Sequence, residues 1–555
     1  MSWKIIESYR KRLAAESGAY AKRGGRLSVC LVYPNRYRTA MSNLGFQTVY
    51  ALFNEHPEVI CERAFLPDDD ELAEYRKAGT PLLSLESQRP VADFDLLAFS
   101  VSFESDYLHI PAIFDLAGIP PFAADRESRH PLVMAGGAAL FLNPEPVAEL
   151  MDLVVVGEAE PLLPELLALL LETAGSDRRS LLERACRLSG LYVPSFYRVL
   201  YEGPAVAKRE ETGGAPPTVE RRWERALDEH PTRTVIAAPD TEFSDMHLVE
   251  LSRGCPRGCR FCAAGFIYWP YRQRSLEVMK EEAEEGVLRK EKVGLVGAAV
   301  SDYRGIGELS RHILEKGGRV SVSSLRIDGL DDEMIEVLKA SGHKTVALAP
   351  EGGSQRLRDL IGKNIREEQI LAACDRLIGH DILNLKLYFI IGLPTETPAD
   401  LEEMIRLVNK IRERVVEAAR ANRRLGEIVL SVNPFIPKPF TPFQWCGMED
   451  LKSLEKKVRL LQKAVAGLSN VRMQVESLRE AQLQAFLSRG DRRLARWLVL
   501  SHQNGSWKRA AKEIGLDVTQ FAERTIPLEE ILPWGFIAGG AGMEHLRREY
   551  EKAFS

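Results

Sequence analysis

Three cysteines stand close together at positions 255, 259 and 262. Their C-x3-C-x2-C spacing lets three thiolates converge on one metal centre, and cysteine is the usual ligand of iron–sulfur clusters. A cubane cluster needs four ligands, yet Cys374 and Cys446 are far along the chain and stand singly among apolar or aromatic neighbours. Three ligands leave one iron open to a substrate or cofactor, which indicates a catalytic cluster rather than an electron-transfer or structural one.

A zinc site, a disulfide or chance would account less well for the three cysteines. A zinc site requires a tetrahedral set of four Cys or His ligands, and the nearby His247 belongs to an apolar run. A disulfide is disfavoured because no secretion signal is visible and the cytosol keeps thiols reduced. Chance clustering of three among only eight cysteines is the weakest hypothesis.

With Phe261 just before its last cysteine, the loop resembles the cluster-binding loop of the radical S-adenosylmethionine (radical SAM) enzymes. The resemblance implies a [4Fe-4S] cluster held by Cys255, Cys259 and Cys262, whose fourth iron chelates the amino and carboxylate groups of S-adenosylmethionine. It further implies reductive cleavage of that cofactor to a 5′-deoxyadenosyl radical. An electron donor such as a flavodoxin or ferredoxin is therefore expected. No catalytic residue beyond the cluster ligands is assigned.

Composition limits the class of protein. The chain has 555 residues, which predicts three or four domains. Its 45% hydrophobic and 28% charged residues are ordinary for a globular protein. A net charge of −5 gives no signal for nucleic-acid binding. No apolar run approaches the ~20 residues that cross a bilayer, and the first residues lack a signal-peptide core. We therefore expect a cytoplasmic protein that makes no membrane contact.

The first half of the chain alternates apolar runs with helical patterns. Residues 1–25 predict an amphipathic helix. Strands without a polar face indicate a parallel sheet covered on both sides, so we expect a doubly wound, Rossmann-like α/β domain over residues 1–200. A charged, turn-rich linker or hairpin follows over 201–245. The strand candidates are residues 27–33, 59–66, 95–102, 130–135 and 152–156.

Ligands of doubly wound sheets lie beyond the carboxyl ends of the strands. Four strand ends of this domain, residues 34–43, 100–106, 136–145 and 157–160, could contact a ligand, and the last two carry glycines, although a glycine at any one strand end is ordinarily a turn. Next to a radical SAM core, this half resembles the cobalamin-binding domain of cobalamin-dependent radical SAM proteins. The resemblance implies cobalamin contacts from Asn43, Ser102, Gly136, Gly137, Asn143, Glu145, Gly157 and Glu158.

One feature of the cobalamin mutases is absent. The first loop, residues 33–42, has no histidine and so no D-x-H-x-x-G motif. Many radical SAM relatives bind cobalamin without a protein histidine on cobalt. A domain that has kept the fold and lost the ligand is the alternative.

A second series of strands and amphipathic stretches favours an open (β/α)6 partial TIM barrel over residues 246–445. Active sites of such barrels lie at the carboxyl ends of the strands. Residues 446–555 predict a helical cap over the barrel. The strand candidates are residues 247–251, 293–300, 320–325, 345–349, 383–391 and 427–432.

The resemblance implies contacts to S-adenosylmethionine from these strand ends. Ala298 stands where many relatives carry Gly-Gly-Glu, with the acidic residue displaced to Asp302. A guanidinium suits planar carboxylates, and an ordinary helix cap with a surface ion pair is the weaker alternative for a Ser and an Arg after the third strand. The implied residues are Phe261, Ala298, Ser324, Arg326, Glu351, Gly392 and Leu393.

These patterns predict an enzyme that cleaves S-adenosylmethionine reductively, with cobalamin-dependent methylation of an unactivated carbon as the leading hypothesis. A cobalamin-free radical modification, with the first domain as a scaffold, is the alternative within the class. A non-catalytic iron–sulfur electron-transfer protein is the alternative outside it. A methylthiotransferase is disfavoured because Cys30 and Cys61 stand singly, where those enzymes carry a second cysteine trio. Nothing in the sequence selects a substrate.

Overall fold

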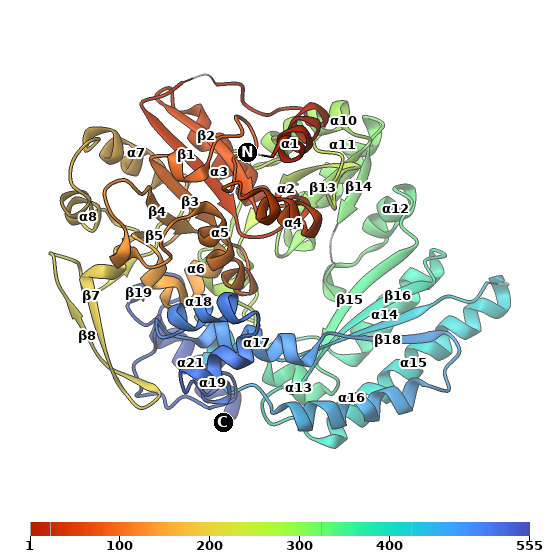
Figure 1. The fold of residues 1–555 in the computed structure, drawn as a ribbon. Coiled ribbons are helices and arrows are strands. Elements are labelled where there is room, and N and C mark those ends of the chain that lie inside the picture. Colours follow the sequence, from red (N-terminus) through yellow and green to blue (C-terminus); the bar gives the residue numbers. More distant parts are fainter. Residues whose placement is uncertain (1, 23, 323–324, 423) are drawn as a thin grey trace. The chain divides into compact units, whose positions relative to one another are not determined.

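A computed structural model describes residues 2–22, 24–322, 325–422 and 424–555 (Figure 1). The chain forms two compact units, and the C-terminal stretch, predicted as one cap, contributes residues to both. Unit 1 comprises Met1–Ser244, Phe486–Phe521 and Glu529–Gly539, and unit 2 comprises Asp245–Ala485, Ala522–Leu528 and Gly540–Ser555.

Unit 1 is built on one sheet with the strand order β2-β1-β3-β4-β5-β6. All pairs are parallel except β5 with β6. The five apolar runs all form strands, whereas β6 has only two residues and was not predicted. The strand order reverses between β1 and β3, where doubly wound sheets open a crevice. The strands are β1 (Leu27–Tyr33), β2 (Val59–Phe65), β3 (Leu96–Ser100), β4 (Leu132–Gly136), β5 (Leu153–Val155) and β6 (Leu191–Tyr192).

Helices and a hairpin complete unit 1. Asn43 caps α3, because its side chain accepts a hydrogen bond from Phe46 N at 2.9 Å. The stretch predicted as a linker or hairpin begins with the antiparallel pair β7 (Tyr197–Glu202) and β8 (Ala205–Glu211), and β9 (Val219–Glu220) pairs with β19 (Ile537–Ala538). The helices are α1 (Trp3–Ala15), α2 (Tyr37–Met41), α3 (Leu44–Glu55), α4 (Asp69–Ala78), α5 (Ile110–Ala117), α6 (Ala138–Leu142), α7 (Leu163–Glu172), α8 (Arg178–Ala185), α18 (Leu494–Asn504) and α19 (Trp507–Glu513).

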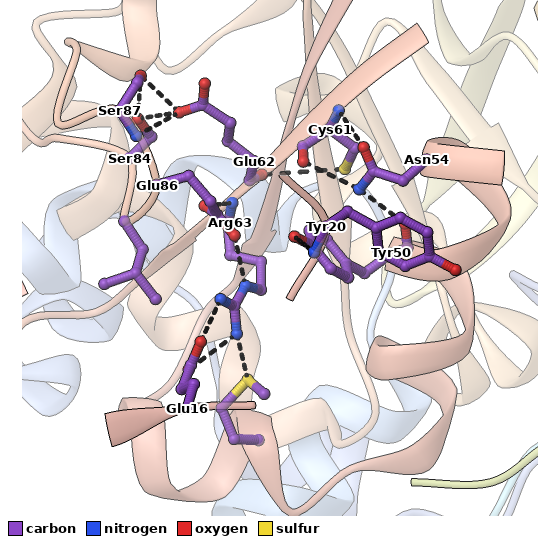
Figure 2. A network of polar contacts seen from close by, with 12 residues as sticks. Glu16, Tyr20, Tyr50, Asn54, Cys61, Glu62, Arg63, Ser84, Glu86 and Ser87 are labelled. Carbon is purple, nitrogen blue, oxygen red and sulfur yellow. Dashed lines mark hydrogen bonds and ion pairs between the residues drawn. The ribbon is translucent and has the colours of Figure 1, made fainter. Parts of the chain in front are cut away.

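A buried ion network joins the segment after α1 to strand β2 (Figure 2). Arg63 is fully buried and donates hydrogen bonds to Glu16 at 2.6 Å and to Glu86 at 2.7 Å. The adjacent Glu62 accepts a hydrogen bond from the Ser84 hydroxyl at 2.6 Å. A buried guanidinium is tolerated only with such partners, so the network fixes the N-terminal segment on the sheet.

Substitution of Arg63 tests this network. We expect Arg63→Met to lower the free energy of unfolding of unit 1 by about 3–5 kcal/mol, because Glu16 and Glu86 lose their buried counter-charge. Differential scanning calorimetry measures the effect. The exposed pair of Arg26 with Glu58 is the matched control, and Arg26→Met should cost no more than about 1 kcal/mol. Equal losses in both variants would contradict the interpretation.

Unit 2 carries its parallel strands in two sheets, with the orders β10-β13-β14 and β15-β16-β17-β18. All six predicted barrel strands are present. The structure adds a seventh, β18, inside the region predicted to be helical, so that prediction was wrong for these residues. The strands are β10 (Met246–Glu250), β13 (Lys292–Val296), β14 (Arg319–Val322), β15 (Thr345–Glu351), β16 (Asn384–Ile391), β17 (Ile428–Pro434) and β18 (Val471–Val475).

Amphipathic helices cover these strands. In α16 the buried residues Leu454, Val458 and Leu461 recur at intervals of three or four, so one face of the helix packs inward. No described helix is long and apolar enough to cross a bilayer. The helices are α9 (Ala264–Ile267), α10 (Leu276–Arg289), α11 (Ile306–Glu315), α12 (Asp332–Ala340), α13 (Gln355–Leu360), α14 (Glu367–Gly379), α15 (Pro398–Asn422), α16 (Leu451–Val465) and α21 (Met543–Phe554), while α17 (Leu478–Arg489) and α20 (Val518–Ala522) give residues to both units.

Candidate iron–sulfur and cofactor sites

The cysteine loop follows strand β10. The short strand β11 (Ser252–Arg253) leads into the loop, and β12 (Arg272–Gln273), which comes after the loop, pairs with β11 in antiparallel fashion. Gly254 starts the loop with a φ of +83°, and a Cβ there would lie 2.8 Å from the Tyr268 carbonyl oxygen. Only glycine fits this close approach without strain. Gly254 therefore starts the turn directly before the first cysteine, and the pairing of β11 with β12 brings the two ends of the loop together.

The three cysteine side chains are close enough to influence one another. None forms a disulfide. Burial raises the pKa of the Cys262 thiol to about 11, and the neighbouring Cys259 and Cys255 add to the rise. Burial also raises the pKa of Cys255, with Cys259 again contributing. Because crowded thiolates repel one another, the loop favours protonated thiols until iron binds and displaces the protons.

Ligation of a [4Fe-4S] cluster by these three cysteines stays a prediction. Among the residues that the structure describes, no three His, Cys, Asp or Glu side chains could hold one metal ion. In a cubane, each thiolate binds its own iron, so the three sulfurs surround the cluster and need not meet at one atom. Cys374 is buried in α14, where burial raises its pKa to about 12. Cys446 is buried in the apolar cluster against which Phe261 packs.

Glu351 lies beside the cysteine loop at the end of β15. Its charge is among the causes that raise the pKa of Cys262. Burial raises the pKa of Glu351 itself, while Lys363, whose Nζ lies 3.5 Å from its Oε1, acts in the opposite direction. Its φ of +64° is unfavourable for a residue with a side chain. The fold therefore holds this carboxyl next to Cys262 at a cost in backbone strain.

Arg326 belongs to a group of four charges beside Cys255. Its Nε lies 2.9 Å from Asp328 Oδ1 and 3.9 Å from Asp302 Oδ2. Arg257 of the cysteine loop pairs with both aspartates, and Arg326 acts to lower the pKa of Cys255. Arg257 was not predicted as a site residue, although its position between Cys255 and Cys259 could have indicated a role at the site. A ligand carboxylate at Arg326 must compete with Asp328.

The remaining residues implied for S-adenosylmethionine have varied surroundings. Gly392 has a φ of +73°, and its N–H donates to Glu396 at 3.0 Å. Leu393 is buried in an apolar cluster against which Phe261 packs. Ala298 is exposed in the turn after β13. Ser324 lies outside the described residues.

In unit 1, the predicted glycines pack against neighbouring backbone. A Cβ on Gly137 would lie 2.3 Å from the Val101 carbonyl oxygen, and one on Gly157 would lie 2.1 Å from that of Arg222. Both have a positive φ. A Cβ on Gly136 would lie 3.3 Å from the Cβ of Val155. Internal packing therefore already requires Gly137 and Gly157.

The polar residues after β4 and β5 also have internal partners. Asn143 donates to the carbonyls of Ser488 at 3.1 Å and Gly490 at 2.7 Å. Glu145, fully buried, accepts from Arg492 at 3.0 Å. Glu158 accepts from the backbone N–H of Glu224 at 2.9 Å. A cobalamin contact at these three residues stays a prediction, and the ligand would have to displace existing bonds.

The loops after β1 and β3, where the strand order reverses, carry a polar group with fewer internal partners. Asn43 donates to Ser102 Oγ at 3.0 Å, and Asn35 donates to Asp106 Oδ1 at 2.8 Å. Asp106 is 1% exposed, and its Oδ2 has no hydrogen-bond partner among the described residues. Burial raises its pKa to about 6. A buried carboxyl oxygen without a donor is costly, so Asp106 is a candidate contact for a ligand that donates hydrogen bonds.

Comparisons with known proteins agree with the cysteine loop. Residues 249–408 match the radical SAM superfamily, and residues 45–194 match the family of N-terminal regions of radical SAM proteins. The uncharacterized protein MJ0966 of Methanocaldococcus jannaschii is 32% identical over 493 residues, which cover 88% of this chain and 94% of that protein. The chain belongs to the radical SAM superfamily. Its activity class is thus that of a radical SAM enzyme, for which a [4Fe-4S] cluster and S-adenosylmethionine are implied.

More distant similarities are partial. The threonylcarbamoyladenosine tRNA methylthiotransferase MtaB of Thermotoga maritima is 25% identical over 210 residues, which cover 35% of this chain and 48% of that protein. The cobalamin-dependent S-adenosylmethionine radical enzyme OxsB aligns over 90% of this chain and 64% of its own, with a TM-score of 0.48 and 14% identity. The radical S-adenosylmethionine methyltransferase TsrM of Kitasatospora setae aligns over 73% and 72%, with a TM-score of 0.45 and 15% identity.

Iron analysis of cysteine variants tests the ligand set. We expect anaerobically reconstituted wild-type protein to hold about four irons, the content of one cubane. Cys255→Ala and Cys262→Ala should lose most of that iron, because two thiolates do not retain the cluster. Cys374→Ala removes a buried cysteine from α14 and should keep the iron. Loss of iron in the Cys374 variant, with retention in the two loop variants, would overturn the assignment.

Proposed function

We propose that this radical SAM enzyme cleaves S-adenosylmethionine reductively at a cluster held by Cys255, Cys259 and Cys262. The observation that carries the proposal is the crowding of three disulfide-free cysteines beside a half-buried carboxyl and a paired guanidinium. Three thiolates leave one iron for the cofactor. Charged groups of both signs beside them match the amino and carboxylate groups of a methionine moiety.

The chain's own residues would bind and orient the cofactor. Arg326 supplies a planar donor for the carboxylate, and Glu351, half-buried beside Cys262, supplies an acceptor for amino or hydroxyl hydrogens. The turn at Gly392 offers backbone groups to the adenine. When bound, the cluster supplies the one electron that breaks the C5′–S bond, which yields methionine and the 5′-deoxyadenosyl radical. A flavodoxin or ferredoxin is the proposed electron donor.

Production of 5′-deoxyadenosine tests this activity. We expect reduced, reconstituted protein to form it from S-adenosylmethionine, and Glu351→Gln to weaken cofactor binding about 10-fold or more, since a hydrogen bond to a charged group contributes about 1.5–3 kcal/mol. The exposed Glu336 of α12 gives a matched control, Glu336→Gln. Chromatography of the products and equilibrium binding supply the readouts. A full iron content without 5′-deoxyadenosine would favour an electron-transfer protein instead.

The finer proposal is cobalamin-dependent methylation of an unactivated carbon. It is supported by the doubly wound sheet of unit 1, by the reversal of its strand order between β1 and β3, and by the unpartnered oxygen of Asp106 in the loop after β3. Asn43 and Ser102, which are hydrogen-bonded to each other, lie in the loops after the same two strands. When bound there, cobalamin would supply the methyl group, and the radical would activate the carbon. A cobalamin-free radical modification is the competing proposal.

Cobalt analysis separates the two proposals. Protein purified anaerobically with hydroxocobalamin should hold cobalt near one equivalent beside its iron. Asp106→Ala should reduce the bound cobalt several-fold, because the loop after β3 loses its buried carboxyl. Asp70→Ala, at an exposed position of α4, should not. Iron without cobalt in the wild-type protein would make unit 1 a scaffold and exclude the methylation proposal.

A further inference from the structure

The last helix of the chain, α21 (Met543–Phe554), packs directly on the cysteine loop within unit 2. The ring of His545 lies 6.4 Å from that of Phe266, which follows the loop. Tyr550 packs against the apolar cluster that also receives Phe261, the residue before Cys262. The helix therefore lies beside the loop from His545 to Tyr550.

Arg260 is the link between the helix and the cluster ligands. It stands between Cys259 and Cys262, and it is 7% exposed. Its Nε and Nη2 donate to Glu549 Oε2 of α21 at 3.2 and 3.1 Å. A buried guanidinium needs a counter-charge, and Glu549 provides one from the last turns of the chain.

The remaining guanidinium nitrogen and the backbone of Arg260 also form hydrogen bonds. Its Nη1 donates to the Leu360 carbonyl at 2.7 Å, and its backbone N–H donates to Ile361 at 2.8 Å. Its own carbonyl accepts from Phe443 N at 3.2 Å. The C-terminal end of α13, the segment after β17 and α21 thus all meet at this one residue.

Aromatic contacts fix the helix in place independently of the ion pair. Tyr550 lies 5.5 Å from Trp445 and 4.9 Å from Phe554, measured between ring centroids. Leu546 is almost completely buried. Removal of one carboxylate should therefore change the hold on Arg260 without releasing the helix.

We propose that Glu549 is a positioning residue for the iron–sulfur cluster. Acting through Arg260, it holds the turn from Cys259 to Cys262 in the arrangement that two of the irons require. The inference rests on the proposed cluster, and it gives the C-terminal helix a role in cofactor retention in addition to packing.

The test uses the reconstituted full-length holoenzyme. Glu549→Ala should release iron to a ferrous chelator about tenfold faster than wild type, because a charged hydrogen bond is lost. It should also alter the electron paramagnetic resonance spectrum of the dithionite-reduced cluster. Glu549→Gln keeps an acceptor without the charge and should fall between the two. Glu551→Ala, at an exposed position of the same helix, is the matched control and should match wild type.

A double variant shows whether Glu549 acts through Arg260. On an Arg260→Gln background, Glu549→Ala should no longer accelerate iron release, because the partner is already lost. Circular dichroism verifies that each variant is folded. The inference is overturned if Glu549→Ala behaves as Glu551→Ala, or if its effect is unchanged on the Arg260→Gln background. Wild-type protein that holds no cluster would instead refute the proposed function.

Discussion

Three cysteine side chains in one short loop would repel one another as thiolates, and this repulsion is the constraint that the site in unit 2 has to meet. Burial and mutual charge raise the pKa of Cys255 and Cys262, so the empty loop favours thiols and the thiolates become favourable only with iron. Contacts from the surrounding chain hold the loop in place despite this repulsion. Arg260 anchors it to three other segments, and Arg326 offsets the negative charge near Cys255. The cysteine loop follows β10, the Arg326 segment follows β14, and Glu351 ends β15, so each of these groups lies at the carboxyl end of a parallel strand.

The strands and the cysteine ligands could be predicted from local sequence. Apolar runs without a polar face indicated the five longer strands of unit 1, since burial on both sides leaves a continuous signal. In unit 2, apolar segments separated by amphipathic, charged stretches indicated the six predicted strands. Strand β18 was missed because Val471–Val475 alternates polar and apolar residues directly after an amphipathic helix. The sharing of the C-terminal stretch between the units was also missed. It depends on contacts such as Asn143 with Gly490, which join residues more than 300 positions apart.

Residue types alone did not separate ligand contacts from packing. Gly137 and Gly157 matched a cofactor loop, yet both are also required by close backbone approaches inside unit 1. Asn143 and Glu145 matched it as well, and both have buried partners. Asp106 carried no motif, but it is the buried carboxyl with an unpartnered oxygen at the reversal of strand order. The ion pairs of Arg257 and Arg260 could not be predicted from the cysteine motif, because their partners, Asp302 and Glu549, come from distant segments.

The central claim is that the three-cysteine cluster has an open iron that binds S-adenosylmethionine. The most direct test is the electron paramagnetic resonance spectrum of the reduced, fully reconstituted protein, recorded with and without this cofactor. An open iron predicts that the g-values of the cluster change when S-adenosylmethionine is added, because the coordination of one iron changes. A full iron content with an identical spectrum in both samples would mean that the fourth iron is already closed, and it would contradict the account.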